Sequence, residues 1–169
     1  YIVDPAGAYT LHIEKVTFDG EWIEGPAFHI SDDAWSGDRI RDIAVDKTSD
    51  ALYAVGRRGP EESSDIWIRK YNKALELQWQ EFYPPFGDAA PQLDDSAYGV
   101  TIGPSGNVYV TGQVDYPGGD ITPESSGNYL WVAKWDSAGG EPIWSRDWSM
   151  YADVDPVLSP AFGSHGVDI

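Results

Sequence analysis

Residues 98–148 read YGVTIGPSGNVYVTGQVDYPGGDITPESSGNYLWVAKWDSAGGEPIWSRDW, and this stretch decides the fold. Runs of β-branched and aromatic residues, such as 108–111, alternate with clusters of turn residues, such as 103–107. Glycine supplies positive φ and proline presets a turn, so each cluster ends one strand and starts the next. The stretch predicts four short antiparallel strands, at 98–102, 108–111, 129–135 and 143–148.

The same pattern occurs upstream, with a lysine before an aromatic residue in register at Lys70 and Lys134. Trp22, Trp79 and Trp144 recur at similar intervals, and we expect them to pack between neighbouring sheets. A long repeat with four strands in each unit is the signature of β-propeller blades. The matched segments are 41–45 with 98–102, 50–56 with 106–112, and 66–71 with 131–135.

The sequence therefore predicts an all-β fold of β-propeller blades, each with four antiparallel strands, in an incomplete propeller. The expected units are a partial blade at 1–30 with third and fourth strands, complete blades at 40–83 and 97–148, and a first strand at 165–169. Closed propellers typically have four to eight blades. We expect either a piece of a longer propeller or several copies assembled into one ring, since an open arc exposes apolar faces at both ends.

The amino-acid composition supports an all-β repeat and limits the classes of molecule that the chain is expected to bind. The chain has 8 Trp, 10 Tyr and 18 Gly among 169 residues, which favours an all-β repeat over a helical fold. The absence of cysteine excludes disulfides and thiolate metal sites. The net charge of −17 disfavours nucleic acid and anionic membranes and suits cations or basic partners, although it also serves solubility. No apolar run is long enough to span a membrane.

Two motifs resemble a known family. The segment Gly-Pro-Ser-Gly-Asn-Val-Tyr-Val-Thr-Gly at 103–112 and the segment Val-Ala-Lys-Trp-Asp-Ser-Ala-Gly-Gly at 132–140 are similar to the core of the bacterial seven-bladed β-propeller repeat family. The resemblance is specific for 97–148 and looser for 40–83, and Gly103 replaces the usual aspartate that Asp46 keeps. It implies an exported, extracellular, cell-surface or periplasmic protein without a defined enzyme activity.

No catalytic constellation is apparent, so we assign no catalytic residue and expect no enzyme activity in this segment. His12, His29 and His165 are far apart and lack the spacing of metal ligands. Glu61, Glu62 and Asp65 share one loop, but in so acidic a chain a chance cluster is expected.

Acidic residues recur in the three connections between the expected blades. Repeated carboxylates in loops can collect a hard cation such as Ca²⁺. None of these segments matches a Ca²⁺-loop motif, so solvated loops are the competing interpretation, and no other cofactor is expected. The candidate metal ligands are Asp32, Asp33, Asp94, Asp95, Asp153 and Asp155.

Aromatic residues in connections are candidates for ligand contact, because rigid aromatic side chains suit recognition. Trp35, Tyr116 and Tyr151 are of this kind, and Asp115 and Asp120 flank Tyr116 in the longest decorated loop. The competing interpretation is that these rings fold back onto the blades.

Two classes of function follow. The first is a non-catalytic propeller that presents its loops to a protein or carbohydrate partner, either as a fragment of a larger exported protein or as a subunit completed by remaining blades or by other copies of the chain. The second is a fragment of a glycan-active or quinoprotein-like propeller enzyme whose catalytic residues lie elsewhere.

Overall fold

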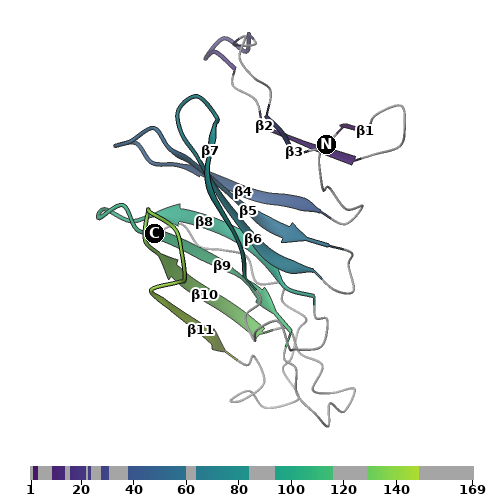
Figure 1. Cartoon of the computed structure of the whole chain (residues 1–169), viewed down its shortest axis with the longest axis vertical. Coiled ribbons are helices and arrows are strands. Elements are labelled where there is room, and N and C mark those ends of the chain that lie inside the picture. The colour runs from purple at the N-terminus through teal and green to yellow at the C-terminus, as the bar shows by residue number, and fades with distance from the viewer. Residues whose placement is uncertain are drawn as a thin grey trace.

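The computed structural model in Figure 1 describes residues 2–3, 9–13, 16–21, 23, 28–30, 38–59, 64–83, 94–115 and 129–148. Every regular element among these residues is a β-strand, and neighbouring strands pair antiparallel. None of them belongs to a helix of the length and apolar character that crossing a membrane requires. The predicted all-β class is confirmed.

Two four-stranded sheets form the body of the molecule, and the chain runs through each as a meander. The first sheet contains β4 (Arg39–Val45), β5 (Leu52–Arg58), β6 (Asp65–Tyr71) and β7 (Leu77–Tyr83), in that order. The second sheet contains β8 (Ser96–Ile102), β9 (Val108–Val114), β10 (Tyr129–Trp135) and β11 (Trp144–Trp148), also in that order. The predicted four strands per sheet are therefore confirmed.

A smaller N-terminal sheet has the order β1-β2-β3. It contains β1 (Ile2–Val3), β2 (Tyr9–Ile13) and β3 (Phe28–Ile30). The sequence predicted two strands in residues 1–30, and the structure corrects this to three. The missed strand, β1, is only two residues long, which is too short to produce an alternating pattern of apolar and polar residues.

Side chains of Asp and Asn shape the turns at one end of the sheets. In the β4–β5 turn, the Asp46 carboxylate accepts hydrogen bonds from the Thr48 backbone N–H at 2.9 Å and from the Ser49 hydroxyl at 2.6 Å. The Ser49 bond and then the Thr48 bond lower the pKa of Asp46. Asn72 after β6 and Asp136 after β10 each accept a bond from the backbone two residues further on. These Asx turns are the local reason that the strands end where they do.

The first strand of each large sheet has a bulge, and a glycine in the second strand accommodates it. The register shifts after Ile40 in β4 and after Ala97 in β8. Ile40 pairs with Gly56, and Ala97 pairs with Gly112. A Cβ at either glycine would overlap the backbone carbonyl of the facing strand. The two sheets therefore share the same irregularity at the same position, which identifies them as repeats of one unit.

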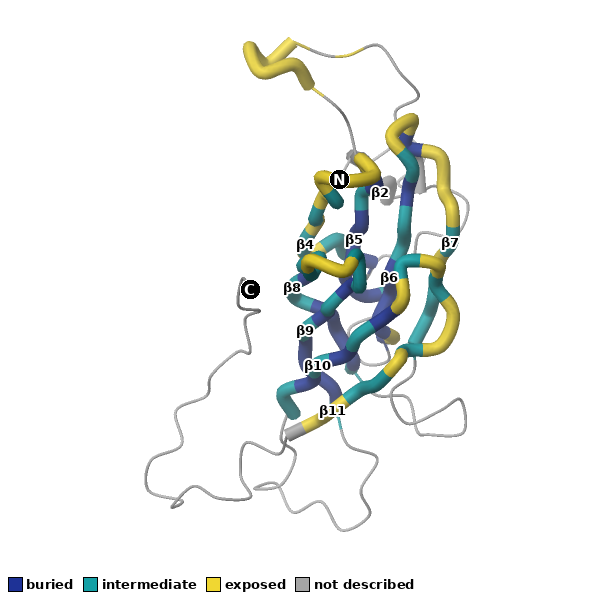
Figure 2. The backbone as a smooth tube through the Cα atoms, turned by 90° about the vertical axis from the view of Figure 1, so that its left-hand side faces the viewer, coloured by how far each residue is buried: buried dark blue, intermediate teal, exposed yellow. Residues whose placement is uncertain are grey.

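The core lies between the two large sheets, where the buried residues are concentrated in Figure 2. The sheets approach each other most closely where β8 lies against β4 and β5. At that point the Asp42 carboxylate in β4 accepts a 2.9 Å hydrogen bond from the Val100 backbone N–H in β8. The buried members of this core are Ala51, Tyr53, Val55, Ile66, Ile68, Ala97, Val100, Val108, Val110, Val114, Trp131, Ala133 and Trp135.

The first sheet is apolar on its other face as well. A second cluster there contains the buried side chains of Trp67 and Tyr71, while Ile43 and Val45 on the same face are 50% and 51% exposed. A sheet that faces water on one side normally alternates apolar and polar residues, whereas apolar residues on both faces suit a sheet with a layer on each side. Both faces of the first sheet therefore carry apolar residues, and the second sheet covers one of them.

A cluster that we call the lysine clamp joins the first sheet to the second. The Lys70 ammonium lies 5.5 Å from the centre of the Tyr53 ring, and Trp79 meets Tyr53 edge-on at 6.0 Å. The Lys70 Nζ and the Trp79 Nε1 both donate hydrogen bonds to the carbonyl of Ser137 in the β10–β11 turn, at 2.7 and 3.1 Å. Gly139 of that turn lies so close to the Trp79 ring that an added Cβ would come within 2.9 Å of it. The predicted packing of Trp79 between sheets is therefore confirmed. Trp144 instead packs on Tyr109, on the face of the second sheet that points away from the first, and Trp22 lies outside the described residues.

Replacing Gly112 by alanine tests the shared bulge. We expect Gly112→Ala to lower the free energy of unfolding by about 3 kcal/mol, because the new Cβ overlaps the Ser96 carbonyl and the strands must separate. Chemical denaturation monitored by tryptophan fluorescence measures this loss. Gly106→Asn is the matched control, since Gly106 has a φ of 79° with open space around it, and asparagine tolerates that conformation. Equal stability of Gly112→Ala and the wild-type chain would contradict the assignment.

Candidate functional site

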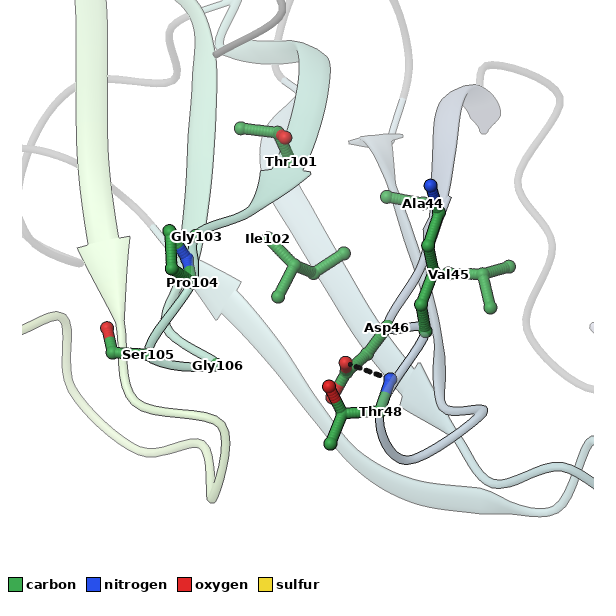
Figure 3. A pocket seen from close by; sticks show the side chains of 11 residues that line it. Ala44, Val45, Asp46, Thr48, Thr101, Ile102, Gly103, Pro104, Ser105 and Gly106 are labelled. Atoms are coloured by element: carbon green, nitrogen blue, oxygen red, sulfur yellow. Dashed lines mark hydrogen bonds between the residues drawn. The ribbon is translucent and has the colours of Figure 1, made fainter.

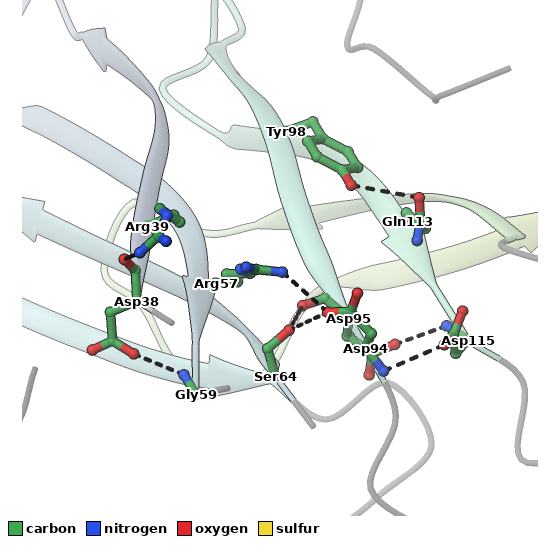
Figure 4. A network of polar contacts seen from close by, with 10 residues as sticks. All are labelled: Asp38, Arg39, Arg57, Gly59, Ser64, Asp94, Asp95, Tyr98, Gln113 and Asp115. Atoms are coloured by element: carbon green, nitrogen blue, oxygen red, sulfur yellow. Dashed lines mark hydrogen bonds and ion pairs between the residues drawn. The ribbon is translucent and has the colours of Figure 1, made fainter. Parts of the chain in front are cut away.

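A network of polar side chains lies at the end of the sheets opposite the Asx turns (Figure 4). The Ser64 hydroxyl donates to the Asp94 carboxylate at 2.5 Å and contacts the Asp95 carbonyl at 3.0 Å. Arg57 lies 3.5 Å from the same Asp94 carboxylate oxygen. Ser64 precedes β6 of the first sheet, whereas Asp94 and Asp95 precede β8 of the second. The network therefore ties the two sheets together where the connections β5–β6, β7–β8 and β9–β10 leave them.

One part of this network is repeated in both large sheets. The Asp95 carboxylate accepts a 2.9 Å hydrogen bond from the backbone N–H of Asp115, and the Asp38 carboxylate accepts a 2.7 Å bond from that of Gly59. Each aspartate directly precedes the first strand of its sheet, and each donor directly follows the second strand. Both aspartates are buried. Both aspartates accept a hydrogen bond from a backbone N–H that lies just beyond the second strand and has no partner in the β-sheet.

The Asp95 carboxyl is the most perturbed acid in the described chain. Burial raises the pKa of Asp95 to about 7, with smaller contributions from the negative charges of Asp115, Asp65 and Asp94, while the hydrogen bond from the Asp115 N–H acts in the opposite direction. Burial also raises the pKa of Asp115. A buried carboxyl among other carboxylates prefers its neutral form because the charged form loses hydration. Only 4% of the Asp95 surface is exposed, so its carboxyl is available to the sheet contacts and not to a ligand from solvent.

A shallow cavity of about 600 Å³ lies between the β4–β5 and β8–β9 turns at the opposite end of the sheets (Figure 3). Asp46 and Thr48 line one side, and Ile102, Pro104 and Ser105 line the other. Asp46 is the only carboxylate in this lining, and it is held by its own turn. The cavity is a gap between equivalent turns of two stacked sheets, and it brings no group of chemically reactive side chains together.

The structure brings together three of the residues predicted as site residues, namely Asp94, Asp95 and Asp115. The Asp115 carboxylate accepts a 3.4 Å hydrogen bond from the Asp94 backbone N–H, so the loop after β9 contacts the connection before β8. Among the described residues, no group of three or more His, Asp or Glu side chains is arranged to hold a metal ion. The other candidates lie outside the described residues: Asp32, Asp33, Asp153 and Asp155 as metal ligands, and Trp35, Tyr116, Asp120 and Tyr151 as ligand contacts.

Sequence reasoning missed Asp38, Arg57 and Ser64 as members of the network. A signal for Asp38 was present, because Asp38 stands before β4 as Asp95 stands before β8. Ser64 carried no comparable signal, since a serine next to a strand is common in any loop. Arg57 is the penultimate residue of β5, and its contact with Asp94 depends on the second sheet being in place.

The described fold defines a class, an all-β repeat protein of stacked antiparallel meander sheets. Comparison with protein-family models gave no match for this chain, and comparison with curated proteins gave none either. The functional assignment therefore depends on the geometry of the described residues.

The perturbed carboxyl gives a pH-dependent prediction. The folded chain keeps Asp95 protonated up to about pH 7, whereas the unfolded chain ionises it near its ordinary pKa of 3.8. The unfolded state therefore binds fewer protons between these values, so this group lowers the free energy of unfolding as the pH rises from about 4 to 7. The loss contributed by this group is up to about 4 kcal/mol.

Asp95→Asn keeps an oxygen for the Asp115 N–H and removes the titration, so we expect the variant to lose less stability than the wild-type chain over this pH range. Urea unfolding at pH 4.5 and pH 8 measures the difference. The exposed Asp147→Asn serves as the control and should follow the wild-type pH dependence. A pH dependence of Asp95→Asn that equals that of the wild-type chain would show that Asp95 ionises normally in the folded state.

Proposed function

We propose that the chain is a non-catalytic segment of a β-propeller and acts as a scaffold that presents loops to a protein or carbohydrate partner. The observation that carries this proposal is the division of the molecule into two unlike ends. Turns of five to eight residues connect the strands at one end, whereas the connections 84–95 and 115–128 at the other end, which carries the acidic network, are longer. Connections on a rigid scaffold are where binding residues usually lie.

The propeller arrangement is supported by the equivalence of the two sheets. Each is a four-stranded meander with the same bulge and the same closing aspartate, and each carries the same group of lysine, tyrosine and tryptophan. The face of the first sheet that carries Tyr53 packs against the face of the second sheet that carries Val108 and Val110. Tyr109, the equivalent of Tyr53, lies on the opposite face of the second sheet. Stacking with a constant direction adds one blade after another, as a propeller requires.

We propose an exported or surface localisation, because the segments 103–112 and 132–140 resemble a bacterial repeat family whose members are often exported. A net charge of −17 repels nucleic acid and anionic membranes, and it favours a partner that presents basic groups or neutral sugars. The candidate contacts in the connections are Tyr116 and Asp120 next to the described Asp115, together with Trp35 and Tyr151.

The alternative is a fragment of a propeller enzyme, either glycan-active or quinoprotein-like. Asp95 is the one described carboxyl with a pKa suited to general acid–base chemistry near neutral pH. A catalytic acid must reach its substrate, however, and the Asp95 carboxyl is buried and bonded to the Asp115 backbone in a position that Asp38 repeats. Burial and the neighbouring carboxylates account for the raised pKa of Asp95 without a catalytic role, so we place this alternative second.

A glycan array probed with the labelled chain tests the carbohydrate arm of the proposal. We expect saturable binding of one glycan class, a decrease of at least about tenfold in affinity for Tyr116→Ala, and no decrease for Ser105→Ala in a turn at the opposite end. Mass spectrometry of the eluted glycan should show it intact. A cleaved glycan would favour the enzyme alternative. Equal loss of binding in both variants would show that the glycan does not bind at the connection that contains Tyr116.

A further inference from the structure

The second sheet carries a second lysine clamp with the geometry of the first. Lys134 lies 5.4 Å from the centre of the Tyr109 ring, and Trp144 meets that ring at 6.3 Å with an interplanar angle of 62°. In the first clamp the angle between Tyr53 and Trp79 is also 62°. Lys134 pairs with Trp144 across β10 and β11 just as Lys70 pairs with Trp79 across β6 and β7.

The two clamps differ in what covers them. The first is capped by the turn after β10, whose Ser137 carbonyl accepts from both Lys70 and Trp79. The second lies on the face of the second sheet that points away from the first, and within the described part of the chain neither Lys134 nor Trp144 has a hydrogen-bond acceptor for its side-chain nitrogen. By analogy with the first clamp, the second clamp should bind a tight turn that contains a glycine and a backbone carbonyl able to accept hydrogen bonds from Lys134 and Trp144.

The N-terminal part of the chain contains a turn of this kind at 17–21. Its Thr17 N–H bonds to the Glu21 carbonyl at 2.7 Å, and its Gly20 N–H bonds to the Thr17 carbonyl at 2.9 Å. The Thr17 hydroxyl accepts from the Glu21 N–H at 2.9 Å. The turn after β6 has the same three bonds, from Asn72 to Glu76, from Leu75 to Asn72 and from Glu76 to the Asn72 side chain.

Among the described residues two turns with this backbone pattern are open, 17–21 and 103–107, and of these two only 17–21 connects the last two strands of its sheet, as the capping turn after β10 does. The turn after β10 already caps the first clamp. The turn after β6 has Leu75 in place of the glycine, and that side chain is only 6% exposed. In contrast, Gly20 has a φ of 84° with no atom within 4 Å of an added Cβ, and Phe18 is 105% exposed.

We propose that the 17–21 turn of a second copy of this chain caps the Lys134 clamp. The Phe18 carbonyl takes the place of the Ser137 carbonyl and accepts from Lys134 and Trp144, while Gly20 lies against the Trp144 ring as Gly139 lies against Trp79. This inference rests on the proposed stacking of equivalent sheets and names the partner of the exposed face.

Charge at the neighbouring position supports the same pairing. In the covered clamp, Glu81 of β7 accepts a 3.2 Å hydrogen bond from the N–H of Gly140, the residue after the turn glycine. The position equivalent to Glu81 in the second sheet is Arg146, two residues after Trp144 and on the same face. The residue after Gly20 is Glu21, which is exposed. In the proposed contact Arg146 therefore lies opposite Glu21, at the position where Glu81 accepts a hydrogen bond from Gly140 in the first interface.

The contact is heterologous, because the turn of one copy meets the clamp of the next. Such contacts either close into rings or continue as filaments. Sheets that stack around an axis close into a ring after a few units. We therefore expect a closed dimer or a ring of a few copies, in which every 17–21 turn contacts the Lys134 clamp of the next copy.

Multi-angle light scattering and sedimentation of the 169-residue chain test the proposal. We expect concentration-dependent assembly that Gly20→Asn weakens about tenfold, since its side chain meets Trp144 while asparagine keeps the positive φ. Gly106→Asn makes the same change in the β8–β9 turn, where nothing lies within 4 Å, and should assemble as the wild-type chain does.

A charge exchange identifies the contact itself. We expect Arg146→Glu to weaken assembly about tenfold and the combination of Arg146→Glu with Glu21→Arg to restore it to within about threefold of the wild-type chain. Both residues are exposed, so circular dichroism should show unchanged folding. A monomeric wild-type chain at 100 µM, roughly the concentration at which weak specific contacts are populated, would overturn the proposal. So would assembly that is unaffected by Gly20→Asn, or a charge exchange without rescue. Glycan binding by a chain that stays monomeric would overturn the self-assembly alone and leave the loop function in place.

Discussion

Directional contacts hold the two large sheets in their relative position, and the Ser137 carbonyl oxygen makes two of them. It accepts hydrogen bonds from the Lys70 ammonium and the Trp79 indole, two groups that would otherwise be unpaired in a half-buried interface. A hydrogen bond from a charged donor contributes roughly 1.5–3 kcal/mol, and losing the acceptor costs at least as much because the donor loses its water as well. Other hydrogen bonds also cross between the sheets, from the Val100 N–H to Asp42 and from the Ser64 hydroxyl to Asp94. Together these directional contacts supply the registration that the apolar core cannot supply.

The same logic explains why both ends of the sheets are polar. At the turn end, Asp46, Asn72 and Asp136 bind the backbone of their own turns. At the connection end, Asp38 and Asp95 bind the N–H that follows the second strand of each sheet. Carboxylates that serve the backbone account for part of the acidic composition. Other described acids, such as Asp50 and Glu76, are exposed and add negative charge to the surface.

Much of the fold could be predicted from the sequence because turn chemistry and strand alternation are local. The segments 98–102 and 108–111 lie within β8 and β9, and the alignment of Lys70 with Lys134 corresponds to equivalent positions in the two sheets. The strand β1 was missed because two residues carry no periodicity. The hydrogen bond of the Lys70 side chain could not be predicted, because its acceptor is the backbone carbonyl of Ser137, 67 residues away in the sequence.

The candidate site was harder to predict for a physical reason. The pair Asp94 and Asp95 stood out as a cation site, since adjacent carboxylates in a loop suggest metal ligands. In the structure, Asp95 binds the Asp115 N–H and Asp94 accepts from Ser64. Which of these roles a carboxylate takes depends on the groups that the fold places beside it, and composition does not carry that information. The equivalent Asp38, without an acidic neighbour before it, would have shown the structural role.

A double-mutant cycle between Trp79 and Gly139 tests the central claim most directly, because the two residues belong to different sheets and meet only if the sheets stack as described. Gly139→Ala places a methyl group against the Trp79 ring, and Trp79→Leu removes that ring. The cost of positive φ at position 139 is the same in both backgrounds and cancels in the cycle. We expect a coupling free energy of about 1–2 kcal/mol, with Gly139→Ala less destabilising when Trp79 is absent. A coupling of zero within error would contradict the stacking of the sheets on which the proposed function and the proposed assembly both depend.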